Sequence, residues 1–169
     1  MLRSAPRDAG PAASAAGFVA GLRDEQAAVA AFAGLLQAEQ DALVQGDADR
    51  LAALAADKAA QIELLSRLGE QRNRHLAAQN LRGSAEGMLT WLSRNPELAA
   101  AANKVWRELL AQAEAARQIN LSNGALIDMG LRQNRLKLAV LQTAASPDGV
   151  YRPDGQLRPL RSARFLSQV

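Results

Sequence analysis

Apolar side chains recur at alternating steps of four and three residues over positions 18–45, and this spacing predicts a long helix. One face of that helix would carry most of the large apolar residues, together with two glutamates. The stripe consists of Phe18, Leu22, Glu25, Val29, Phe32, Leu36, Glu39 and Leu43. We expect Gly46 to end this helix and Asp47 to cap the next one.

The same rhythm predicts a second helix over about 48–80. Its stripe consists of Leu51, Ala55, Lys58, Ile62, Leu65, Gly69, Arg72 and Leu76. Because the connection to the first helix is so short, the two helices should form an antiparallel hairpin. Gly83 and Gly87 then interrupt the pattern. Ser84 can cap a short helix, and Trp91 on that helix is expected to plug the open end of a bundle.

Residues 97–146 contain no proline and are predicted to form one long helix. Asn95-Pro96 supplies a capping side chain followed by a proline in the first turn, which is a favourable helix start. The helix has two adjacent seams, as expected for a helix wedged against both members of a hairpin. The first seam is Leu98, Ala102, Val105, Leu109, Gln112, Ala116 and Ile119. The second seam is Trp106, Leu110, Ala113, Arg117, Asn120, Gly124 and Ile127.

The predicted helices differ in length. At about 1.5 Å per residue, the second helix spans about 50 Å and the third about 75 Å, so 131–146 should extend past the hairpin by roughly 24 Å. This stretch keeps several large apolar residues, namely Leu131, Leu136, Leu138, Val140 and Leu141. An exposed apolar helical face usually marks a partner surface. The alternatives are a kink at Gly130 that folds the helix back, or a dimer that covers the face.

The fold class predicted from these patterns is all-α. We expect an elongated antiparallel three-helix bundle of long coiled-coil-like helices, with one additional short helix and flexible termini. The domain organisation would be a flexible N-terminal arm over 1–16, the helical bundle with its long C-terminal helix over 17–146, and a mobile C-terminal tail over 147–169.

Composition argues against an enzyme or a metal centre. Only 4% of the residues are aromatic, there is no cysteine, and His75 is the single histidine. A zinc or di-iron centre would need more nitrogen or thiolate ligands, so we expect no metal and no cofactor. Glu25 and Glu39 lie about 21 Å apart along one helix, too far for an acid–base pair, and are better explained as polar breaks in a seam. His75 is expected to face solvent or to lie on a helix surface.

The chain has a net charge of +3 and an isoelectric point near 9.9. Its cations are mostly interleaved with acids, except for Arg158, Arg161 and Arg164 near the end. No apolar run is long enough to span a membrane, and no signal-peptide pattern opens the sequence. We therefore expect a cytoplasmic protein without membrane insertion and without a nucleic-acid partner. The basic balance nevertheless keeps a nucleic-acid-associated protein as one alternative, and a self-associating coiled-coil scaffold or adaptor as another.

Two groups of residues suggest binding. Asn120, Asn123 and Gly124 are unfavourable inside a helix. The two asparagines lie one turn apart, where they could bond to a partner backbone or could fix the register of the helices. Tyr151 is the single tyrosine and lies in a proline-flanked stretch, which suits an exposed interface anchor. It could also fold back on the bundle.

The second half of the chain contains a series of distinctive segments, namely Asn120-Leu-Ser-Asn123-Gly124-Ala-Leu126-Ile127, then Asn134, then Leu138-Ala-Val-Leu141, then Tyr151-Arg-Pro-Asp154-Gly155-Gln156. Less specific segments precede them, namely Leu35-Leu36-Gln-Ala-Glu39, Leu43-Val-Gln-Gly46-Asp47 and Lys58. Together these segments resemble the FlgN family of bacterial flagellar export chaperones, and the similarity covers roughly residues 30–156. The tyrosine motif of this family, Tyr-Gly-x-Asp-Gly-Gln, is matched at Tyr151, Asp154, Gly155 and Gln156, and the chain departs from it at Arg152-Pro153.

The resemblance implies a cytoplasmic chaperone that binds the C-terminal segments of the hook-associated proteins FlgK and FlgL. It would keep them from assembling early and deliver them to the export gate protein FlhA. The residues expected to bind cargo are Asn120, Asn123, Gly124, Ile127, Leu131, Asn134, Leu138 and Leu141. Those expected to bind the gate are Tyr151, Asp154 and Gly155. Components of the export ATPase complex and a second copy of the chain are further partners that we consider.

Overall fold

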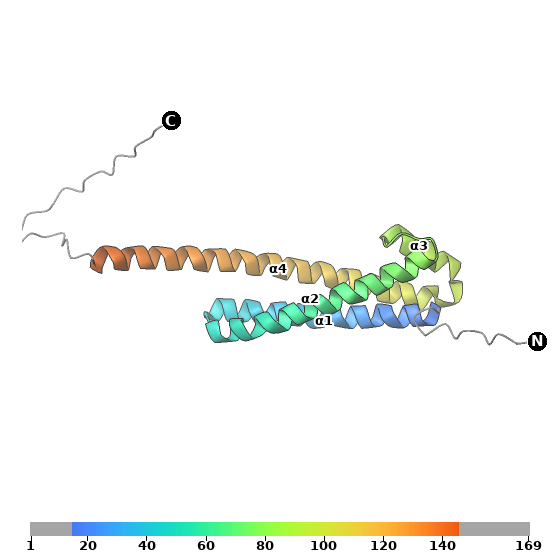
Figure 1. Ribbon diagram of the computed structural model, residues 1–169, viewed down its shortest axis with the longest axis horizontal. Helices are drawn as coiled ribbons and strands as arrows, with labels where there is room; N and C mark the ends of the chain where they lie inside the picture. The colour runs from blue at the N-terminus through green and yellow to red at the C-terminus, as the bar shows by residue number, and fades with distance from the viewer. Residues whose placement is uncertain (1–14, 146–169) are drawn as a thin grey trace, which may run out of the picture. The chain divides into compact units, whose positions relative to one another are not determined.

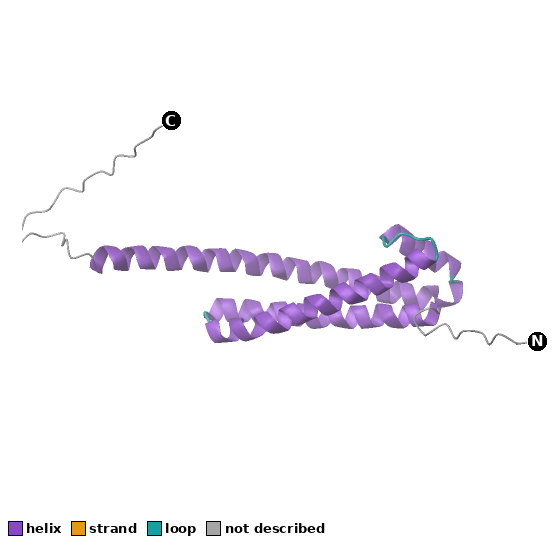
Figure 2. Ribbon diagram, viewed as in Figure 1, coloured by secondary structure: helices purple, strands orange, loops and turns teal. Residues whose placement is uncertain are grey.

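The computed structural model describes residues 15–145 of the chain. All regular secondary structure in this range is helical (Figure 2), which confirms the all-α prediction. The chain divides into two compact units, which we call the first unit, Met1–Ile127, and the second unit, Asp128–Val169. The expected mobile tail over 147–169 lies outside the described residues, as does most of the expected arm over 1–16.

Within residues 15–145, four helices follow one another (Figure 1). They are α1, Ala15–Gln45; α2, Ala48–Ala78; α3, Ala85–Arg94; and α4, Pro96–Ala145. Ala15 and Ala16, which we expected in the N-terminal arm, instead form the start of α1. The first unit contains α4 as far as Ile127, and the remainder of α4 belongs to the second unit.

α1 and α2 form the predicted antiparallel hairpin and pack closely along their length (Figure 1). Gly46 has a φ of +69°, a conformation that residues with a Cβ rarely adopt, and it ends α1 as predicted. The Asp47 carboxylate then accepts a 3.0 Å hydrogen bond from the backbone N–H of Arg50 and caps α2. Two short-range signals in the sequence therefore define this turn.

The short helix α3 begins at the predicted cap. The backbone N–H of Gly87 donates a 3.3 Å hydrogen bond to the Ser84 hydroxyl. A Cβ at Gly87 would lie 1.9 Å from the carbonyl oxygen of Arg82, so the chain needs glycine at this close approach. Trp91 is fully buried, with its ring centroid 4.6 Å from that of Phe18, and its predicted burial is confirmed.

The main hydrophobic core of the first unit draws on all four helices. Its buried members are Phe18, Val19, Leu22, Leu76, Met88, Trp91, Leu92, Ala102 and Val105. The first predicted seam of α4 is confirmed, because Ala102, Val105, Leu109 and Ala116 are buried, and Leu98, Gln112 and Ile119 are partly buried. This core holds the hairpin, the short helix and the first half of α4 together.

The second predicted seam of α4 is mostly exposed, and only Trp106 and Ala113 of its residues are partly buried. Leu110 and Ile127 are 45% and 41% exposed, and Arg117, Asn120 and Gly124 are exposed as well. The reason is the wider spacing of this helix: the backbone of α4 approaches α1 and α2 less closely than these two approach each other. At that spacing the first half of α4 contacts the hairpin through one face.

The predicted seam of α2 is wrong at two positions. Ala55 and Ile62 are exposed, Ile62 by 47%. Gln61 lies at the inward position instead, and its side-chain amide donates a 2.9 Å hydrogen bond to the carbonyl oxygen of Ala28. A straight helix drifts by about 20° per heptad relative to a strict seven-residue repeat, which moves the buried stripe from one column of residues to the next.

His75 is more enclosed than a solvent-facing residue. The imidazole is partly buried and stacks on the ring of Phe18, with the centroids 4.2 Å apart. It also forms a 3.1 Å hydrogen bond with the side chain of Gln79. His75 therefore contributes to the packing between α1 and α2 while it stays partly exposed.

In the second unit the structure describes one helical segment, Asp128–Ala145, which is the end of α4. The helix continues through Gly130 without interruption, so the alternative in which the chain reverses direction there is wrong. Every side chain from Leu131 to Ala144 is exposed. Among the described helices, none has both the length and the hydropathy that a bilayer crossing requires.

Candidate functional site

Asn123 lies at the centre of a polar network in the first unit. Its side chain is 1% exposed, and its amide nitrogen donates 2.8 Å hydrogen bonds to the carbonyl oxygen of Leu36 and to a carboxylate oxygen of Glu39. Both acceptors belong to α1. Asn123 Oδ1 is buried without a hydrogen-bond partner among the described residues. Asn123 is thus engaged inside the unit, as expected of a residue that fixes helix register.

Glu39 extends this network to α2. Lys58 Nζ lies 2.9 Å from Glu39 Oε2 and donates a 3.2 Å hydrogen bond to Asn120 Oδ1. Burial alone would raise the pKa of the Glu39 carboxyl. The hydrogen bonds from Lys58 and Asn123, together with the positive charge of Lys58, outweigh that effect and hold the pKa below its ordinary value. Glu39 is therefore a charged residue that joins three helices.

A second interhelical ion pair lies nearer the other end of the hairpin. Glu25 on α1 is buried and pairs with Arg72 on α2. The guanidinium of Arg72 also lies over the Trp106 ring of α4, 5.3 Å from its centroid. The interpretation of Glu25 and Glu39 as polar breaks in a seam is thus confirmed, since each pairs with a cation on α2 and not with the other.

Sequence reasoning missed these interhelical pairs. A signal for them was present, because acids occupied stripe positions on the first helix while Lys58 and Arg72 occupied stripe positions on the second. Opposite charges on the facing stripes of an antiparallel hairpin are candidates for pairing. Which acid faces which cation depends on helix register, which spacing alone does not supply.

The remaining residues of the first unit that we expected to bind cargo are more open. Gly124 is exposed, and a Cβ added to it would meet no atom within 4 Å. Ile127 is 41% exposed. Asn120 is exposed, although its side-chain oxygen accepts the bond from Lys58. The structure therefore gives Asn120 and Asn123 partners within the unit, while Gly124 and Ile127 remain accessible.

An apolar face runs along the described helix of the second unit. Leu131, Leu138 and Leu141 are 49%, 57% and 64% exposed. Spacings of seven and three residues place them on one side of a helix, and Asn134 lies between them on that side. We call this surface the Leu138 face. It can bind an apolar polypeptide segment, because its side chains are large, aligned and solvent-accessible.

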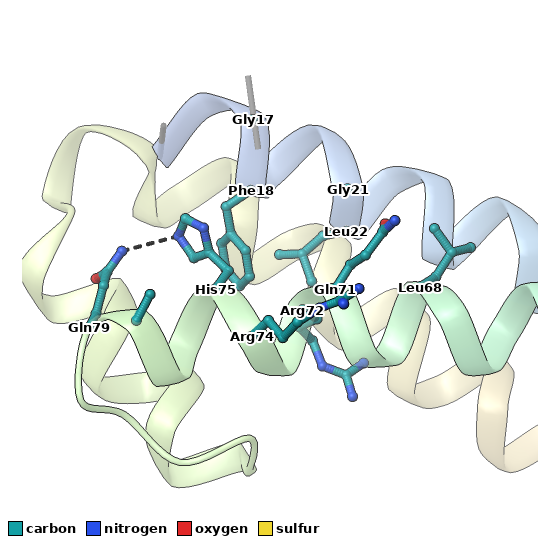
Figure 3. Close-up of a pocket in the computed structure, with 11 residues that line it drawn as sticks. Gly17, Phe18, Gly21, Leu22, Leu68, Gln71, Arg72, Arg74, His75 and Gln79 are labelled. Carbon is teal, nitrogen blue, oxygen red and sulfur yellow. Dashed lines mark hydrogen bonds between the residues drawn. The ribbon is translucent and has the colours of Figure 1, made fainter. Parts of the chain in front are cut away.

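A groove of about 670 Å³ lies at the end of the hairpin opposite Gly46, between the start of α1 and the end of α2 (Figure 3). Phe18 and Leu22 supply apolar lining, and Arg72, Arg74 and His75 supply polar lining. Arg72 pairs with Glu25, and His75 stacks on Phe18 and bonds to Gln79. Most of these polar groups thus pack α1 against α2.

The described residues 15–145 contain no cluster of three or more potential metal-ligating acids, histidines or cysteines. The expected gate-binding residues Tyr151, Asp154 and Gly155 lie outside the described residues. For the described part of the chain, the candidate site that we consider further is the Leu138 face of the second unit, on which three large apolar side chains are exposed.

A known protein family matches most of the chain. The family model described as "FlgN protein" matches residues 14–159, which is most of the chain. The matched residues include both interhelical ion pairs, the Leu138 face and the stretch around Tyr151. The searches of curated proteins and of solved structures returned no match.

Proposed function

Because the chain belongs to the FlgN family, whose members are flagellar export chaperones, we propose that it binds the C-terminal segments of FlgK and FlgL and delivers them to the export gate. Chaperones of this family bind flagellar hook-associated proteins. For this chain we propose FlgK and FlgL as the two cargo proteins, the Leu138 face as the surface that receives them and the export gate as their destination. The family is not known for enzymatic activity, and we propose a binding role only.

The single observation that carries the proposal is the exposure of the Leu138 face. Three leucines on one side of a helix would lose water contact if an apolar helix packed against them. Fully burying a leucine side chain contributes about 1.5–3 kcal/mol. Ordering the cargo on binding offsets part of this favourable free energy. The net affinity would then be moderate, which would allow the cargo to be released later.

We assign different roles to the two units. Asn123 and Glu39 hold the first half of α4 on the hairpin, so the first unit acts as the scaffold. The second unit receives cargo through Leu131, Asn134, Leu138 and Leu141. Gly124 and Ile127 on the exposed side of the first unit are additional candidates for cargo contact.

The gate contact is proposed for the residues that follow α4. Tyr151, Asp154 and Gly155 match the family's tyrosine motif, and the resemblance assigns that tyrosine to the export gate protein FlhA. They follow the cargo-binding segment closely in sequence. One molecule could therefore hold cargo and present it to the gate at the same time. Components of the export ATPase complex are further proposed partners in the same delivery step.

A pull-down tests the proposal. The full-length chain is immobilised and incubated with purified FlgK or FlgL, each either intact or lacking its C-terminal segment. Intact proteins should be retained and truncated ones should not. Equal retention of intact and truncated FlgK and FlgL would show that the C-terminal segment is not what the chain recognises. Absence of retention for both intact proteins would refute the cargo assignment.

A further inference from the structure

The second unit exposes another apolar face besides the Leu138 face. Met129, Leu136 and Val140 are 52%, 68% and 68% exposed. At about 100° per residue, they lie roughly opposite the leucines of the Leu138 face on the same helix. We call this second surface the Leu136 face. A helix with apolar residues on two opposite sides is typical of one that is enclosed between neighbours.

Charged side chains separate the two faces. Arg132 and Arg135 lie along one edge and Lys137 along the other. Asp128, at the start of the segment, is its only acid, so 128–145 carries three cations and one anion, a net charge of +2 (3 − 1). Each apolar face is thus bordered by positive charge.

We propose that this segment binds two amphipathic helical stretches of one cargo polypeptide, one on each face, and that acidic side chains border the apolar seam of each stretch. The inference rests on the proposed function and adds the architecture and charge of the bound cargo to it. One cargo helix on the Leu138 face would leave Leu136 and Val140 in water. A second stretch removes that apolar surface from solvent.

The positive charges of the segment favour an acidic cargo polypeptide over two other possible occupants, a second copy of the segment and the end of the chain itself. A second copy of the same segment would bring three further cations against Arg132, Arg135 and Lys137, and like charges across an interface are unfavourable. The end of the chain itself, 156–169, contains Arg158, Arg161 and Arg164 and no acid. A polypeptide with acids beside its apolar positions complements both edges of the segment.

Thiol labelling tests whether both faces are covered, since the native chain contains no cysteine. Leu138→Cys, Val140→Cys and the control Leu89→Cys on α3 each place one thiol at an exposed position. Each full-length variant reacts with a fluorescent maleimide, alone and in complex with the FlgK C-terminal segment. Cargo should slow labelling at positions 138 and 140 and leave position 89 unchanged.

The results of the labelling experiment separate a failure of the two-helix proposal from a failure of the proposed function. Protection at position 138 alone would overturn the two-helix proposal while leaving the proposed function intact. If position 140 is already protected without cargo, and sedimentation shows a dimer, a second copy occupies the Leu136 face and the proposal is wrong. If the cargo segment does not bind the native chain, the proposed function fails and this inference fails with it.

Substitution tests the affinity and the charge. The double variant Leu136→Ser/Val140→Ser should weaken cargo binding roughly tenfold or more, with helical circular dichroism unchanged. Reversing two edge cations, Arg132→Glu/Lys137→Glu, should also weaken it, whereas Arg107→Glu on the first half of α4 should have little effect. Undiminished binding by the first variant would refute the second contact, and undiminished binding by the charge reversal would refute the acidic border.

Discussion

The Asn123 amide donates a 2.8 Å hydrogen bond to the carbonyl oxygen of Leu36, which joins α4 to α1 in the buried interior of the first unit. The same amide also bonds to Glu39, which pairs with Lys58 on α2. One buried polar side chain is therefore connected to both helices of the hairpin, directly to α1 and through Glu39 to α2, as expected of a residue that contributes to helix register.

Asn123→Ala should lower the free energy of unfolding by about 1–3 kcal/mol, because it removes a buried hydrogen bond and one to a charged group. Urea denaturation followed by circular dichroism measures the change. Asn134→Ala is the matched control: it makes the same substitution on the same helix at an exposed position and should change stability by at most about 0.5 kcal/mol. Equal effects of the two variants would contradict a register role for Asn123.

The lowered pKa of Glu39 predicts that the free energy of unfolding depends on pH. Its pKa is lower in the folded chain than its ordinary value of 4.5, so the unfolded chain takes up the proton first as the pH falls. The stabilisation by ionised Glu39 is therefore fully present above the unfolded pKa and is lost as the pH falls through the folded pKa. Glu39→Gln should cost about 1 kcal/mol near neutral pH, and this difference from the native chain should shrink below pH 4.5.

Denaturation of both chains between neutral and acidic pH measures this difference. Glu63→Gln on α2 is the control, because Glu63 is exposed and forms no ion pair with a described residue. Its effect should be small and should change little with pH. A constant difference between the native chain and Glu39→Gln across the acidic range would contradict the role of the Glu39 charge.

Two glycine-to-alanine substitutions should have opposite effects. Gly87→Ala should destabilise the first unit, because the new methyl would collide with the backbone carbonyl of Arg82. Gly124→Ala meets no atom within 4 Å in the middle of α4 and should stabilise the helix by about 1 kcal/mol or less. Thermal denaturation compares the two. If Gly124→Ala stabilises the chain yet weakens cargo binding, cargo approaches Gly124 closely. A destabilising Gly124→Ala would contradict the open space seen there.

Tyr151→Ala should leave cargo binding intact and weaken binding to the cytoplasmic domain of FlhA. The physical basis is that an aromatic residue that anchors one interface contributes strongly to that interface and little to a separate one. Binding of the preformed chaperone–cargo complex to immobilised FlhA measures the effect, with Arg152→Ala as a neighbouring control. Loss of cargo binding in Tyr151→Ala would show that the two sites are not separate.

Features fixed by local sequence could be predicted. The turn at Gly46 and Asp47, the cap at Ser84 and the start of α4 at Pro96 each depend on neighbouring residues, and the structure confirms them. The first seam of α4 was also predictable, because its apolar residues repeat with helical spacing. Such signals specify where a helix lies in the sequence and which side of it is apolar.

Features that depend on the spacing between helices could not be predicted. The exposure of Leu110 follows from the distance of α4 from the hairpin, which periodicity does not encode. The partners of Glu39 and the stacking of His75 on Phe18 depend on axial register and on tertiary neighbours. The cargo-binding assignment rests on exposed leucines together with family resemblance, and it stays a prediction.

Titration calorimetry of Leu138→Asp with the FlgK C-terminal segment tests the central claim most directly, with Leu121→Asp as the control. Leu121 is 56% exposed on the same helix but belongs to the first unit, outside the Leu138 face. We predict that Leu138→Asp abolishes measurable binding while Leu121→Asp retains it, and that both keep the helical circular dichroism of the native chain. Binding by Leu138→Asp with native affinity would contradict the assignment of cargo to this face.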